Sequence, residues 1–422
     1  MLRFLVLALF PHFALPTASS SDVRATGGDM NACNNQRSLF SIVWGCFTTI
    51  FACIWVSAHP NVPPPVPRPP KKDATVIAHL KWYLIDSTIG VRRRLKLVLV
   101  AFIAPELIVG FAGRQLETAW YFSREFNLSL THGFFISMGG FVDSEKHPIV
   151  DTIQVMRHLY HIRQVSEQDI FNRSQGDAFS KGIALLQALW FVLQGLARLQ
   201  QHLTLTELEV ATLGFAAVNA FGWLLWWKKP LDVRAPIVLP PLEEDVGIYA
   251  GDPGRGREPE RSDTGEKRPL RERFSALFGV SDVRRDYHHA EAVPTFHFAT
   301  GSDDHERYTP SISLLVALIF SAVHCAAWRT HFLSAAEMWL WRAASLVLGI
   351  APAVALSVHQ CATVNPDSDR LGVLLVIRLY IIGALLYVPA RIILVILPLM
   401  ALRDVPGTAY LEVNWNRYLP HV

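Results

Sequence analysis

The sequence has few charged residues and few cysteines, and each shortage excludes a class of protein. Asp, Glu, Lys and Arg make up 18% of the 422 residues, below the roughly 25% of a typical soluble domain. The formal net charge of +3 is too small to indicate a nucleic-acid-binding protein. Five cysteines without a CxxC pair argue against a zinc site and against a complete set of disulfides. We therefore predict no nucleic-acid partner and no cofactor.

Common enzyme motifs are also missing. The patterns GxSxG, GxxxxGK[ST] and GxGxxG do not occur, so the usual serine hydrolase and nucleotide-binding signatures are absent. The 16 histidines do not form the repeated boxes of di-iron enzymes, and we interpret His158 and His161 as surface or interfacial residues. One aspartate-rich sequence, NPDSD at 365–369, has no second copy with which to share two metal ions, so we interpret it as a turn.

Long apolar runs are what the sequence has in abundance. Hydrophobic residues make up 51% of the chain and the mean hydropathy is +0.26. They gather in runs of about 18 to 25 residues, the length that a helix needs to cross a hydrocarbon layer roughly 30 Å thick. We predict an all-α, multi-pass transmembrane helical bundle with apolar segments at 39–57, 95–113, 182–198, 206–227, 311–328, 338–357 and 372–401.

The runs divide the chain into four parts. Residues 1–20 pass from Arg3 through an apolar stretch to PTASS, which is typical of a signal peptide. An N-terminal membrane region follows at 21–227. Residues 228–310 form a polar loop rich in Gly, Pro and both charge signs, which we predict to be largely disordered. A C-terminal membrane region covers 311–422. The expected partner is a lipid bilayer of the secretory pathway, in the endoplasmic reticulum, Golgi, vacuole or plasma membrane, and the sequence specifies no protein partner.

The positive charges beside the runs create a conflict in the topology. By the positive-inside rule, Arg92 to Arg94 and also Lys228 and Lys229 should be cytoplasmic. If every run crossed once from a lumenal start, the two lysines would be lumenal. The conflict disappears if the segment 95–113, which contains Pro105 and Glu106, is kinked or returns to the same side. Glycans at the sequons of Asn127 and Asn172 would place that region in the lumen.

Four sequence blocks carry a resemblance to a known family: WGCFTTIFACIWVSAHPNVPPP, LTHGFFISMGGF, LTELEVATLGFAAVNAFGWLLWWKKPLDV and VNWNRYLPHV. Together they resemble a family of fungal multi-pass membrane proteins without an assigned activity. The similar blocks run from about Cys33 to the C-terminus, except in the polar loop. The resemblance implies a fungal integral membrane protein and supplies no catalytic residue.

Three residues are the candidates for chemistry: Glu106, His132 and Glu207. An ionisable group inside an apolar run raises a functional hypothesis, although Glu207 and Glu209 would also suit the start of a helix. For Glu106, function and simple pairing with Arg114 or Arg198 are equally compatible with the sequence.

Our leading hypothesis is a non-enzymatic membrane organiser, receptor-like or transporter-like component. The alternative is a membrane-embedded enzyme acting on lipid or isoprenoid substrates. Convergence of Glu106, His132 and Glu207 on one cavity would favour the enzyme. Separate pairing of each residue in packed interfaces would count against it.

Overall fold

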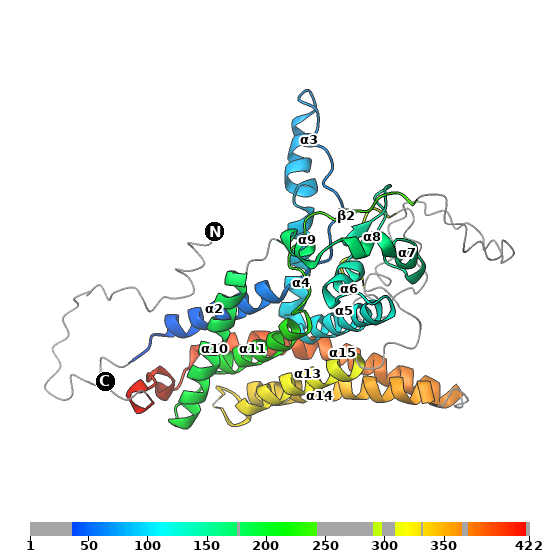
Figure 1. Cartoon of the computed structure of the whole chain (residues 1–422). Helices are drawn as coiled ribbons and strands as arrows, with labels where there is room; N and C mark the ends of the chain where they lie inside the picture. The colour runs from blue at the N-terminus through cyan, green and yellow to red at the C-terminus, as the bar shows by residue number, and fades with distance from the viewer. Residues whose placement is uncertain are drawn as a thin grey trace, which may run out of the picture.

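Long helices dominate the computed structural model, which describes residues 36–174, 178–242, 290–297, 309–330, 332–364 and 370–418 (Figure 1). The predicted signal peptide, most of the predicted polar loop and the NPDSD sequence lie outside these residues. The bundle consists of α2 (Leu39–Ser57), α10 (Ala178–Gln200), α11 (Glu207–Leu225), α13 (Thr309–Ala326), α14 (Ala335–Val364) and α15 (Arg370–Met400). Pro389 and Pro398 lie inside α15, which is nevertheless a single helix.

Four stretches of these helices are long and apolar enough to cross a membrane, as judged from the described residues: 39–57, 182–200, 207–225 and 381–403. A shorter apolar helix covers Ser311–Ala326. Local sequence sets where the helices begin. The Ser38 side chain accepts a hydrogen bond from the N–H of Ser41 at the start of α2, and Thr206 and Glu209 form a reciprocal capping box at the start of α11.

The predicted apolar segment 95–113 is not one helix. It is broken at Ala104 into α4 (Ile89–Ile103) and α5 (Pro105–Glu125). The break follows from Pro105, which disfavours helical backbone at the residue before it but is well suited to the first turn of a new helix. In Figure 1, α4 runs across the direction of α2 and α11, whereas α5 turns away from it.

An arm precedes α4. It contains α3 (Val76–Lys81) and the π-helix η2 (Trp82–Asp86), which lead into α4. Figure 1 shows α3 projecting beyond the rest of the molecule, and none of its side chains is buried.

A second, smaller core lies beside the bundle. It is built from α6 (Leu130–Ser137), α7 (Thr152–Arg157), α8 (Leu159–Gln164), α9 (Glu167–Asn172) and the parallel strands β1 (Phe141–Val142) and β2 (Ile237–Val238). Residues 152–164 form two consecutive short helices, α7 and α8. Val233, Leu239 and Val293 are buried in this core. The folded part thus extends beyond residue 227, where we predicted the polar loop to begin, and resumes before residue 310.

The C-terminal tail, residues 404–418, is held against the bundle by Arg198, which is 2% exposed. Its guanidinium donates hydrogen bonds to the carbonyl oxygens of Leu411 (2.8 Å), Ala409 (3.1 Å) and Thr408 (3.3 Å). Arg37, just before α2, donates to the Ala409 carbonyl (2.7 Å) and pairs through both Nη atoms with Glu209. We call Arg37, Arg198, Glu209 and the tail the latch.

We expect the substitution Arg198→Leu to release the tail, because it leaves the carbonyl oxygens of Leu411 and Thr408 without their donor at a cost of about 1–3 kcal/mol. Trypsin should then cleave the detergent-solubilised protein faster after Arg403 and Arg417, and the thermal unfolding midpoint should fall. Arg124→Leu, which removes an exposed arginine, is the control and should leave both unchanged. A tail that stays equally protected in the Arg198 variant would contradict the role of the latch.

Candidate functional site

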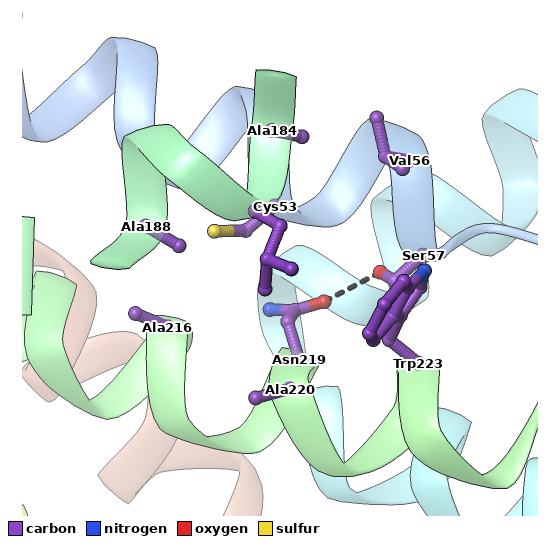
Figure 2. Close-up of a pocket in the computed structure, with 10 residues that line it drawn as sticks. Cys53, Val56, Ser57, Ala184, Ala188, Ala216, Asn219, Ala220 and Trp223 are labelled. Atoms are coloured by element: carbon purple, nitrogen blue, oxygen red, sulfur yellow. Dashed lines mark hydrogen bonds between the residues drawn. The ribbon is translucent and has the colours of Figure 1, made fainter. Parts of the chain in front are cut away.

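A small pocket opens between α2, α10 and α11 (Figure 2). Its volume is about 50 Å³, and four alanines line much of it, so it is far smaller than the roughly 300–1,000 Å³ of a typical ligand site. The Ser57 hydroxyl donates a 2.6 Å hydrogen bond to the Asn219 side chain within it, and Cys53 and Trp223 also line it. The possible nucleophiles of the pocket are the Cys53 thiol and the Ser57 hydroxyl, and this hydroxyl donates its proton to an amide oxygen rather than to a base.

A buried polar cluster lies next to this pocket, where α2 and α11 end. The carbonyl of Ser57 is bonded to Nδ1 of His59 at 2.8 Å, and the carbonyl of His59 accepts a 2.6 Å hydrogen bond from Nζ of Lys229. We call the cluster the junction. It contains His59, Asn61, Gln115, Trp226, Lys229 and the segment 293–297.

Lys229 is the centre of the junction and is fully buried. Its Nζ also donates to Oε1 of Gln115 at 2.7 Å and lies 4.7 Å from the centre of the Trp226 ring. Burial lowers the pKa of Lys229 well below its ordinary value, since an ammonium group loses its hydration there. The sequence pattern predicted the same surroundings for Lys228 and Lys229, just outside a membrane helix. In the turn that ends α11, however, the two side chains differ, since Lys228 is exposed and Lys229 is buried.

Asn61 and Gln115 hold the segment 293–297 through its backbone. Nδ2 of Asn61 donates to the carbonyls of Pro294 and His297, both at 3.0 Å, and Nε2 of Gln115 donates to the same His297 carbonyl at 3.0 Å. Burial lowers the pKa of His297 to about 3. No single residue of this cluster stands out in the sequence, because its members come from four separate stretches of the chain.

Glu106 lies in the first turn of α5 and forms an ion pair with Arg391 of α15. Both side chains are less than 10% exposed. Nε of Arg391 also donates to the Tyr387 hydroxyl at 2.9 Å, and its guanidinium lies 4.3 Å from the centre of the Phe320 ring. The partner is thus neither of the arginines that the sequence suggested.

His132 and Glu207 occupy other parts of the molecule. The ring nitrogens of His132 are bonded to the Ser129 hydroxyl (2.7 Å) and the Val165 carbonyl (2.8 Å), and its ring stacks on Phe141 in the second core. Glu207 is buried in the first turn of α11. The three candidate residues therefore belong to three different surroundings. Among the described residues, no group of three or more His, Cys, Asp and Glu side chains is placed to hold a metal ion.

Both sequon asparagines are exposed. Asn127 has a positive φ of 49° in the turn between α5 and α6, and Asn172 ends α9.

Comparison with protein-family models finds a match to part of the chain. A model of a family of unknown function, DUF8562, matches residues 127–249, which include the short helices and strands of the second core, α10, α11 and Lys229. This match is consistent with the predicted resemblance to an uncharacterised family. No curated protein and no solved structure matches the chain.

We expect Glu106→Leu and Arg391→Leu each to destabilise the protein by about 3–5 kcal/mol, because each substitution leaves the other member of the ion pair buried without its partner. The double variant should be closer to the wild type, since apolar residues can replace a buried ion pair with little loss. Thermal unfolding in detergent tests this. If the double variant loses as much as the two single losses added together, the pair does not exist in solution.

We expect stability to fall as the pH drops from about 6.5 towards 3. In this window the unfolded chain protonates His297 and the folded chain does not, so unfolding becomes easier by about 1.4 kcal/mol per pH unit. The unfolding midpoint of a His297→Asn variant should depend less steeply on pH than that of the wild type. His79→Gln, which replaces an exposed histidine, should retain the wild-type slope. Equal slopes in all three proteins would show that His297 is not buried.

Proposed function

We propose that this chain is a multi-pass integral membrane protein that binds or organises other membrane components rather than catalysing a reaction. The observation that carries the proposal is the position of the ends of α2, α10 and α11, which gather at two opposite faces of the bundle. Six helices would cross the bilayer: α2, α10, α11, α13, α14 and α15. The helices α4 and α5 would enter from one face and return to it.

The latch marks the first face. Through Arg37, Arg198 and Glu209 it joins the start of α2, the end of α10, the start of α11 and the tail after α15. Arg403 pairs with Glu337 at 2.7 Å, which places the start of α14 at the same face. Since α13 leads directly into α14, it ends there too.

The junction marks the opposite face. His59 follows α2 and Lys229 follows α11, and they are bonded to each other. Ser174, before α10, donates a 2.6 Å hydrogen bond to the carbonyl of Leu231, so α10 starts at this face. The segment 293–297, which precedes α13, is bound here as well. The helices α2, α10 and α11 therefore each have their two ends at different faces.

The side of the membrane to which each face belongs is inferred from the predicted signal peptide and from the positive charges. If the signal peptide places the start of α2 in the lumen, the latch face is lumenal and the junction face is cytoplasmic. The cations near Arg92 and Lys228 would then all be cytoplasmic, as the positive-inside rule requires. The break at Ala104 supports the arrangement, because a segment that does not cross removes the conflict between span count and charge.

A binding role is supported by how the polar residues are used. Glu106 is paired with Arg391 and both ring nitrogens of His132 are bonded. These side chains stabilise contacts between helices, and they do not surround a shared cavity. The alternative of a lipid or isoprenoid enzyme would require them to do so.

We expect the chain to stay in the membrane pellet after extraction with alkaline carbonate. A glycosylation tag added after Val422 should acquire a glycan, because the tail lies at the latch face. Asn127 and Asn172 should carry none, so Asn127→Gln and Asn172→Gln should not change electrophoretic mobility. Glycans on either native sequon, or release of the chain by carbonate, would contradict the proposal.

A further inference from the structure

The arm, residues 63–96, is held together as a unit. It consists of a proline-rich stretch, α3, η2 and the first half of α4. Nε1 of Trp82 donates a 2.8 Å hydrogen bond to the carbonyl of Pro67, which fastens the proline-rich stretch to one side of the helix. Thr75 caps the start of α3.

The other side of the helix is apolar and faces outwards. Val76 is 83% exposed, Ile77 79%, Leu80 55% and Leu84 57%. At 100° per residue these positions fall on one side of the helix. Exposed apolar residues that gather on one helix face indicate a binding surface, whereas scattered ones do not.

The arm is also the most basic part of the chain. Between residues 63 and 96 there are eight lysines and arginines and two aspartates, a local charge of +6 in a chain whose net charge is +3. Lys71, Lys72, Lys81, Arg92 and Lys96 are exposed. An apolar helix face with surrounding cations is typical of helices that lie on anionic membranes.

The base of the arm is fixed at the junction face. Nη2 of Arg94 donates to the carbonyl of Trp55 near the end of α2 (2.9 Å), and its guanidinium lies over the Trp55 ring. Nη1 of Arg93 donates to the carbonyls of Val62 and Val293. The arm runs across the direction of α2 (Figure 1), so it would lie parallel to the plane of a bilayer that α2 crosses.

We propose that the arm is a lipid-binding element that lies in the headgroup layer at the junction face and recognises anionic phospholipids. The proposal rests on the proposed membrane topology. The apolar face of α3 enters the acyl-chain boundary, and the exposed cations contact phosphate and carboxylate groups. Arg93 and Arg94 are occupied by contacts within the protein, so the five exposed cations named above and Arg68, which is also exposed, provide the lipid contacts.

Hydrogen exchange of the full-length protein in nanodiscs tests this without labels. The backbone amides of 76–86 should exchange at least about tenfold more slowly in discs of phosphatidylcholine with 30% phosphatidylserine than in phosphatidylcholine alone. The variant Arg92→Gln/Lys96→Gln should remove most of this difference, because each cation removed weakens binding to anionic lipid by about fivefold. The matched control Lys146→Gln/Arg234→Gln removes two exposed cations outside the arm and should retain it.

Three outcomes would overturn the proposal. Equal exchange in both kinds of disc would show that anionic lipid does not bind the arm. A control variant as impaired as the arm variant would show that only overall charge matters. Protection that appears only with two copies of the protein per disc would identify a second copy as the partner. A chain that does not enter discs at all would instead contradict the membrane topology, which the carbonate extraction tests separately.

Discussion

The pairing of polar groups in an apolar interior is the constraint on which this structure depends. A charged or polar side chain removed from water without a partner costs several kcal/mol, and lipid offers no substitute for the missing water. Glu106 and Arg391 meet this constraint across two helices, and Lys229 meets it with carbonyl and amide oxygens. Each such pairing can form only in a few relative positions of the helices. Polar residues thus fix the arrangement that apolar packing alone would leave free.

The latch and the junction stabilise opposite ends of the bundle. The latch connects helix ends that are close to both termini of the described chain, through Arg37 and the tail. The junction connects α2, α5 and α11 with a segment that arrives from far along the sequence. Between them the helices make mainly apolar contacts.

The sequence predicted local features better than distant contacts. The first apolar segment, 39–57, has the same bounds as α2, and Pro105 signalled the break in the run 95–113, because both depend on residues a few positions apart. The partner of Glu106 could not be found in this way, since Arg391 approaches it only after the helices have packed. The burial of Lys229 was equally hidden. Its neighbour Lys228 has the same side chain, and only the geometry of the turn after α11 leaves Lys228 exposed and buries Lys229.

One consequence concerns the residues between β2 and Val293. Leu239, next to β2, and Val293 are buried in the same small core, so that core brings together residues that are far apart in the sequence. The free energy of bringing two residues together grows only with the logarithm of their separation, by about 0.6 kcal/mol per doubling. Val293 can therefore complete the core without lying near β2 in the sequence.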